Sequence, residues 1–357
     1  MCVGYQSGTN LTTGDKNTFI GANTAYNIYN KTVSQSVAIG WQAGAGAGGA
    51  NVSIGNQAMG SMGNGSTSNC VAVGNLAGWY MNGTQGSVAI GGYAGYNIIA
   101  GDSNICVGRY SGYAVNTGKE NVIMGERAGY AITDGTNNVC IGHRASVALT
   151  GGHNIIIGSH AASALENGEG NVIIGNGAAL DGTGDSNVIA VGRNVSVGHS
   201  ATVGSNSITI GNSSISSAYI QTDWTISSDI RIKQDIQESN LGLDFIKLLK
   251  PSTYKKVNPS DYPESLLEPA YKDGSEPRPP NDDTIYTGLI AQEVESALQT
   301  LGKTWSGHKK SSATGKQALQ YGQLVVPLIH AVKELSAEND TLKATLEALT
   351  ARVSALE

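Results

Sequence analysis

Short apolar strands recur along the first 212 residues of the chain, and each of them ends in a glycine. Clear examples are Asn121-Val-Ile-Met-Gly125, Asn138-Val-Cys-Ile-Gly142 and Asn171-Val-Ile-Ile-Gly175, whose glycines lie about 17 residues apart. A period this regular is typical of a solenoid, in which each turn packs on its neighbours along one axis. The pattern therefore predicts a β-solenoid of about 17-residue repeats over residues 1–212.

Both faces of each predicted strand are apolar. Large β-branched residues lie one and three positions before the glycine, as Val37 and Ile39 do, and a small residue such as Ala38 lies between them. Alternate residues of a strand face opposite sides, and a lone solenoid needs to bury one face. We therefore expect the second face to meet another chain, with the small residues on that face allowing a close approach.

At the C-terminus the spacing of apolar residues changes to a heptad pattern. Steps of four and three alternate without a break along one series of positions: Leu328, Val332, Leu335, Asn339, Leu342, Leu346, Leu349, Val353 and Leu356. Such a seam over about four heptads predicts a coiled coil in residues 321–357. Asn339 lies in the seam, where we expect it to fix the register at some cost in stability. The seam alone leaves two and three strands open.

Residues 228–320 differ from the repeat in composition and predict a small α+β domain. All eight prolines follow residue 228. Helical spacing is found in Leu243–Leu249 and Ala291–Leu298, while Ser252–Val257 and Thr284–Ile290 have strand character. Residues 213–227 form a polar connector between the repeat and this domain.

Charge and composition exclude several classes of function. Seven of the 22 Lys and Arg residues precede Ser228, and the net charge is −6, so no basic stripe favours binding to nucleic acid. A run of about twenty apolar residues is missing, so we expect no membrane partner. No cofactor or metal site is expected either. We interpret the four cysteines as small buried apolar residues rather than a disulfide framework; they are Cys2, Cys70, Cys106 and Cys140.

Loop aromatic residues concentrate in the middle of the repeat. These are Trp79, Tyr80, Tyr93, Tyr96, Tyr110, Tyr113 and Tyr130. Two interpretations are open: the rings stack on sugars, or they pack between successive turns. We favour packing.

The motif Ser228-Asp229-Ile230-Arg231-Ile232-Lys233 opens the C-terminal region. It resembles the Ser-Asp-x-Arg-x-Lys motif of the endosialidase-type intramolecular chaperones, which are self-cleaving C-terminal domains of phage tail fibres and tailspikes. Two further runs match this family in the same order: Leu241-Gly-Leu-Asp-Phe-Ile-Lys-Leu-Leu-Lys-Pro251 and Tyr286-Thr-Gly-Leu-Ile-Ala-Gln-Glu-Val-Glu295. The repeat, in turn, resembles the head of trimeric adhesins, a β-roll in which three chains pack side by side.

The family resemblance implies one self-cleavage in cis between Ser227 and Ser228. Ser228 would be the nucleophile and Lys233 the base, while Asp229 and Arg231 would organise the loop by ion pairing. A lysine can serve as a base only if loss of solvent lowers its pKa. A spacing of five residues does not place two side chains on one face of a helix. Either a turn or a neighbouring chain must therefore bring the serine and the lysine together.

These observations predict a homotrimeric phage tail fibre or tailspike, located in the virion and assembled in the host cytoplasm. Its expected partners are a host cell-surface receptor, with glycans among the candidates, and other virion tail proteins. The alternative is a trimeric adhesin of a bacterial surface with a C-terminal trimerisation stalk that is not cleaved. No signal peptide and no C-terminal membrane-anchor strands are recognisable, which favours the first interpretation.

Overall fold

The chain consists of two compact units, Met1–Ile215 and Ser216–Glu357. The computed structural model describes residues 1–357 except 27–30, 45–47, 62–65, 181–183, 198–204, 213, 216–217, 222–223, 268, 273, 275–276, 312–314 and 357. The predicted connector at residues 213–227 therefore lies partly outside the described residues.

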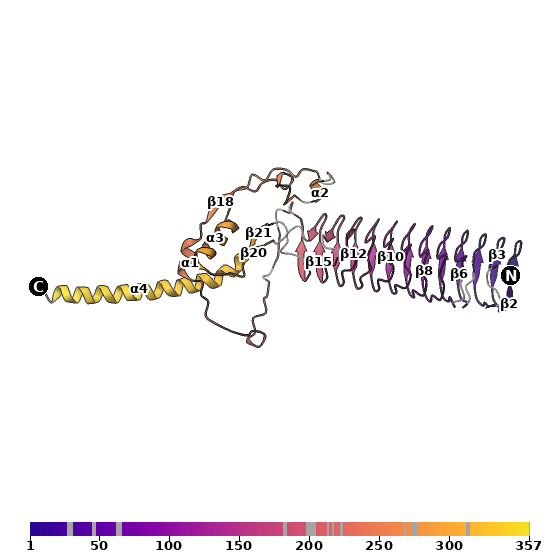
Figure 1. Ribbon diagram of the computed structural model, residues 1–357, viewed down its shortest axis with the longest axis horizontal. Helices are drawn as coiled ribbons and strands as arrows, with labels where there is room; N and C mark the ends of the chain where they lie inside the picture. The colour runs from indigo at the N-terminus through magenta and orange to yellow at the C-terminus, as the bar shows by residue number, and fades with distance from the viewer. Residues whose placement is uncertain are drawn as a thin grey trace. The chain divides into compact units, whose positions relative to one another are not determined.

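The first unit is a parallel β-solenoid, which confirms the predicted fold class. Its strands stack along one line in a 13-stranded sheet (Figure 1). In sheet order the strands are β1 (Cys2–Val3), β3 (Thr18–Ile20), β5 (Val37–Ile39), β6 (Val52–Ile54), β7 (Val71–Val73), β8 (Val88–Ile90), β9 (Ile105–Val107), β10 (Val122–Met124), β11 (Val139–Ile141), β12 (Ile155–Ile157), β13 (Val172–Ile174), β15 (Val188–Val191) and β17 (Ser207–Ile210). Two short parallel pairs accompany this sheet: β2 (Leu11–Thr13) with β4 (Lys31–Thr32), and β14 (Ala179–Leu180) with β16 (Ser196–Val197).

Equivalent positions of successive turns lie directly opposite each other. Val122 pairs with Val139 and Ile123 pairs with Cys140. The glycine that ends each strand is required by this stacking. Gly125 has φ 129°, and a Cβ atom there would lie 2.5 Å from the carbonyl oxygen of Gly142 in the next turn. Only a residue without a side chain fits such a close approach of two backbones.

The small residues of the strands face the interior of the solenoid, so the expectation that they face another chain is wrong. Ala89 and Cys106, in the middle of their strands, are fully buried, whereas the flanking Ile90 and Ile105 are 40% and 38% exposed. The opposite wall of each turn explains this preference. A Cβ atom on Gly112 would lie 2.5 Å from the Cys106 sulfur. The interior is too narrow for larger side chains in most turns, and the β-branched residues form the outer face.

A ladder of buried asparagines runs through the solenoid. The Asn138 side chain donates to Asn121 Oδ1 at 3.1 Å and to the Gly151 carbonyl at 2.9 Å. Its own Oδ1 accepts from the backbone N–H and the side-chain amide of Asn154, both at 3.0 Å. The same arrangement repeats at Asn104, Asn121, Asn154 and Asn171. The ladder satisfies polar groups that would otherwise be buried without partners.

The second unit is a small α+β domain followed by a long helix. Its helices are α1 (Leu243–Leu248), α2 (Pro269–Lys272), α3 (Ala291–Leu301) and α4 (Val325–Ser354). Antiparallel pairing joins β18 (Ser252–Tyr254) to β19 (Tyr286–Gly288), and β20 (His308–Lys310) to β21 (Gln317–Leu319). Short 3-10 helices occupy Ile230–Ile232 (η1), Pro259–Asp261 (η2) and Tyr321–Leu324 (η3). The core consists of Leu241, Phe245, Val294, Ala297, Leu298 and Trp305.

The helix α4 contains most of the predicted heptad seam. Among its described residues, Pro327 and Ala331 are the buried ones. The seam leucines are exposed in the single chain, and Leu342 is 69% exposed. In the part of the chain that the structure describes, no helix is long and apolar enough to span a bilayer.

Candidate functional site

The residues of the Ser-Asp-x-Arg-x-Lys motif form one tight turn. Asp229 has extended backbone angles (φ −65°, ψ 137°) and caps η1, because its side chain accepts a hydrogen bond from the Arg231 backbone N–H at 2.8 Å. Aspartate is among the residues preferred at this position. At the other end, the Lys233 backbone N–H donates to the Ile230 carbonyl at 3.1 Å.

This turn brings the predicted nucleophile and the predicted base together. Lys233 Nζ donates to Ser228 Oγ at 2.7 Å. The sequence left open whether a turn or a neighbouring chain would join the two side chains, and in the structure a turn joins them within one chain. The hydroxyl and the amine are therefore within the distance that direct proton transfer requires.

Asp229 and Arg231 form a two-pronged ion pair beside the serine and the lysine. Arg231 Nε donates to Asp229 Oδ1 at 3.0 Å, and Arg231 Nη2 donates to Asp229 Oδ2 at 2.6 Å. Hydrogen bonds from the Arg231 side chain, and then from its backbone N–H, hold the pKa of Asp229 below its usual range. Because both side chains are exposed to solvent, we assign the pair a geometric role rather than a large contribution to stability.

The whole site is open to water in the single chain. Ser227, Ser228 and Lys233 are exposed. The apolar residues that flank the Ser227–Ser228 bond are exposed as well, with Ile226 at 84% and Ile230 at 72%. Nothing in the described part of the single chain removes the lysine amine from solvent.

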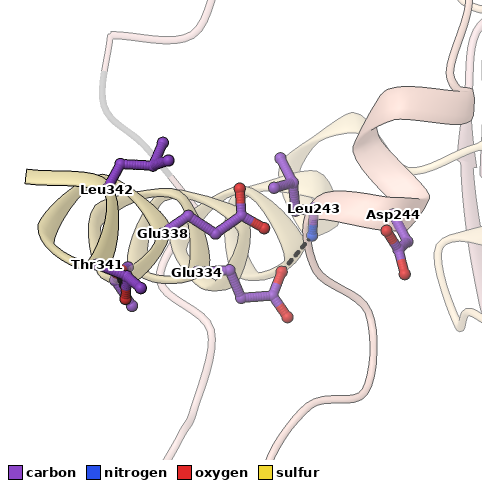
Figure 2. Close-up of a pocket in the computed structure, with 7 residues that line it drawn as sticks. Leu243, Asp244, Glu334, Glu338, Thr341 and Leu342 are labelled. Carbon is purple, nitrogen blue, oxygen red and sulfur yellow. Dashed lines mark hydrogen bonds between the residues drawn. The ribbon is translucent and has the colours of Figure 1, made fainter. Parts of the chain in front are cut away.

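A contact that the sequence did not predict ties helix α4 to the domain. Glu334 of α4 accepts a hydrogen bond from the Leu243 backbone N–H at 2.5 Å and so caps helix α1 (Figure 2). A Cβ atom on Gly242 would lie 2.2 Å from Glu334 Oε2, so this glycine is what permits the contact. The run Leu241–Pro251 was matched to the family, but its pattern alone did not identify a cap located 91 residues away.

Two open pockets lie beside α1 and α4. One, of about 710 Å³, has an acidic lining that includes Asp244, Glu334 and Glu338 (Figure 2). The other, of about 310 Å³, is apolar and includes Leu289, Tyr321 and Leu328 among its lining residues. Among the described residues, no group of three or more His, Cys, Asp or Glu side chains is placed to hold a metal ion.

The C-terminal unit matches a known family. Residues 228–303 match the family model described as "Chaperone of endosialidase", and the match begins at Ser228. No curated protein and no solved structure matches the chain. Residues 228–303 are thus similar to the endosialidase-chaperone family, and together with the β-solenoid before them they fit a tailspike-like protein with a C-terminal chaperone domain.

Proposed function

We propose that this chain is a phage tail fibre or tailspike protein whose C-terminal chaperone domain drives trimerisation and then releases itself by cutting between Ser227 and Ser228. The observation that carries the proposal is the 2.7 Å contact between Lys233 Nζ and Ser228 Oγ, at the first residue of the matched family segment. The released product would act in the virion, where it would attach to a host receptor alongside other tail proteins.

The chemistry begins with Ser228 as the nucleophile. Its Oγ attacks the carbonyl carbon of Ser227, while the hydroxyl proton moves to the neutral amine of Lys233. The C–N bond then breaks, and the amide nitrogen of Ser228 takes the proton back from the lysine. This N→O acyl shift leaves an ester between Ser227 and the Ser228 side chain. Water hydrolyses the ester, which gives a carboxylate on Ser227 and restores the hydroxyl of Ser228. Direct hydrolysis, in which the same base activates water, gives the same two fragments.

Assembly would supply the environment that this chemistry needs. A lysine accepts a proton only as a neutral amine, and removal from water favours that form. The dyad is exposed in the single chain, so we propose that neighbouring chains cover it. The exposed isoleucines on both sides of the scissile bond support this view, because burying them would stabilise such a contact. Cleavage would then follow trimerisation and not precede it.

Two exposed apolar surfaces support self-association. One is the outer face of the solenoid sheet, whose β-branched residues recur in every turn. The other is the leucine seam of α4. In both surfaces the apolar residues recur at a fixed period. The same positions on two copies of the chain can therefore pack against each other along the whole surface.

Mass spectrometry of three variants tests the proposed cut. Ser228→Ala removes the attacking hydroxyl and Lys233→Ala removes the base, so both chains should assemble and stay full length. Ser227→Ala is the matched control: its side chain takes no part, so cleavage should give a fragment that begins at Ser228. Each variant must first be shown to assemble like the wild type. A fragment beginning at Ser228 from the Ser228→Ala chain would mean that an outside protease makes the cut.

A further inference from the structure

Tyrosine rings stack from turn to turn along one corner of the solenoid. The rings of Tyr96 and Tyr113 are nearly parallel with their centroids 5.0 Å apart, and the centroids of the stacked Tyr113 and Tyr130 rings lie 5.1 Å apart. A second column joins Tyr93 and Tyr110 at 4.9 Å. The favoured interpretation of these residues as packing between turns therefore agrees with the geometry, since both faces of the Tyr113 ring are covered by neighbours. The rings are only partly buried.

Arginine side chains lie beside these tyrosines at the same corner of the solenoid. The Cζ atoms of Arg109 and Arg127 lie 4.8 and 5.9 Å from the centre of the Tyr110 ring. Arg144 occupies the position after Arg127 in the next turn, and the rings of His143 and His160 meet edge to face at 5.1 Å. Glu126 forms an ion pair at this corner, with its Oε1 atom 3.6 Å from Arg109 Nη1. We call the residues Tyr93, Tyr96, Arg109, Tyr110, Tyr113, Arg127, Tyr130 and Arg144 the Tyr/Arg corner.

The backbone at this corner disfavours the side chains that occupy it. Tyr93, Tyr110, Arg127 and Arg144 lie two residues after a strand-ending glycine, and all have φ between 54° and 59°. In other turns the same position holds residues suited to this conformation, Asn23, Gly177 and Asn194, and also larger ones, Gln6, Gln42, Gln57, Leu76 and His160, all with positive φ. A left-handed conformation costs a residue with a large side chain about 1 kcal/mol. The left-handed conformation is therefore a general feature of the repeat, and it places these tyrosine and arginine side chains at the same position in successive turns.

We propose that the Tyr/Arg corner binds a linear acidic polysaccharide along the solenoid axis. Exposed guanidinium groups bind carboxylates through paired, charge-assisted hydrogen bonds. Their repetition from one turn to the next suits a polymer that carries a carboxylate on each sugar. The stacked tyrosines hold the corner rigid, so little conformational entropy is lost on binding. The proposal rests on the attachment role proposed above, for which it names the class of receptor.

The ring geometry argues against single-stranded nucleic acid as the ligand. Bases bind by stacking on open aromatic faces, and in the columns those faces are already covered by neighbouring tyrosines. An acidic sugar chain needs hydrogen-bond donors and positive charge at the corner, and it does not need free ring faces.

Fluorescence anisotropy with labelled polygalacturonate and full-length protein tests the proposal. Arg127→Gln/Arg144→Gln should weaken binding about tenfold or more. Glutamine fits the backbone, since Gln42 and Gln57 adopt the same conformation at this position in other turns. Lys16→Gln/Lys119→Gln is the control, because it removes the same charge elsewhere on the solenoid, and it should change binding less than about twofold. Fully methyl-esterified polygalacturonate, which lacks the charge, should not bind.

Several results would overturn the assignment. The two double variants could bind polygalacturonate with equal affinity, or the wild type could bind the esterified polymer as well as the charged one. The wild type could also bind single-stranded DNA more tightly than polygalacturonate, or bind neither polygalacturonate nor polyglucuronate. The mass of the same preparations reports the Ser227–Ser228 cut independently. A chain that cuts itself but does not bind therefore contradicts the polysaccharide proposal alone, and a chain that binds but is never cut contradicts the self-release.

Discussion

The solenoid and the C-terminal unit treat their apolar residues in opposite ways. In the described part of the solenoid, the turns bury a continuous apolar interior, and the asparagine ladder satisfies backbone polar groups between Asn104 and Asn171. In the C-terminal unit, a core of six residues is followed by a helix whose seam leucines are exposed. The first unit buries a core along its whole stack of strands, whereas the second leaves the leucine seam of α4 exposed in the single chain.

In the proposed trimer, this difference gives the two units separate tasks. Because successive turns are so similar, two solenoids that slip by one turn relative to each other keep most of their contacts, so the sheet face specifies register weakly. The α4 seam has a polar residue, Asn339, at a single position, which penalises slipped pairings. We infer that the helix sets the register and the solenoid then extends it.

Removing residues 228–357 should have the largest effect. The fragment 1–227 expressed alone should be insoluble or misassembled, because aligning separate chains before non-local contacts form is slow. The same fragment released after assembly of the full chain should stay folded and assembled. Sedimentation of both preparations at equal concentration checks this prediction. If the separately expressed fragment sediments like the released one, the C-terminal unit is only a stalk.

Shortening two seam residues should break the association directly. Leu342→Ala/Leu346→Ala removes two large side chains from the proposed interface, and each such loss costs about 2 kcal/mol or more in a packed core. Because every chain of the proposed trimer loses both side chains, the association constant should fall by about a thousandfold or more, and cleavage should fall with it. Glu347→Ala, an exposed position outside the seam, should leave both unchanged. Sedimentation equilibrium measures the first effect, and an unchanged molecular mass for the leucine variant would exclude the coiled coil.

Breaking the asparagine ladder should destabilise the solenoid without changing the C-terminal unit. Asn138→Ala leaves the Asn154 backbone N–H and the Gly151 carbonyl without their described partners. We expect a loss of about 3 kcal/mol in the free energy of unfolding. Asn176→Ala, at an exposed position, should change it by less than about 0.5 kcal/mol. Urea unfolding followed by circular dichroism compares the two, and equal effects would deny the ladder its stabilising role.

The period of the repeat was sufficient to predict the strands, but it could not decide which face is inside. Alternation shows that Ala89 and Ile90 point in opposite directions, whereas the narrow interior that selects Ala89 depends on the opposite wall of the turn. The asparagine ladder was missed for a similar reason. Asparagine before a strand also suits an ordinary turn, and only the stacking of turns places one Asn above the next.

At the candidate site, the motif identified the residues and the structure supplied their geometry. Ser228 and Lys233 were selected by resemblance, and their spacing of five was compatible with two arrangements. The cap by Asp229 decides between these arrangements, because it folds η1 and brings the lysine back to the serine. The cap from Glu334 to Leu243 joins residues far apart in the sequence, so no local pattern could reveal it.

The smallest predicted effect concerns the cysteines inside the solenoid. Burial raises the pKa of the Cys106 and Cys140 thiols to about 12. In the unfolded chain the pKa of a cysteine thiol is about 8.5. Between these two pKa values the folded state binds more protons than the unfolded state. The contribution of the thiols to stability is therefore fully present below about pH 8.5 and is lost as the pH rises. Together the two thiols should lower the free energy of unfolding by about 1 kcal/mol between pH 8 and pH 9.

The double variant Cys106→Ala/Cys140→Ala isolates this contribution. Alanine fits the site, since Ala72 and Ala89 occupy the equivalent position in other turns and are fully buried. The other ionisable groups are the same in both proteins, so the difference between wild type and variant reports the thiols. Urea unfolding at pH 8 and pH 9 should show the larger loss in the wild type. Equal losses would mean that water reaches the interior of the solenoid. The description of each turn as narrow and closed, which distinguishes the solenoid from the C-terminal unit, would then be wrong.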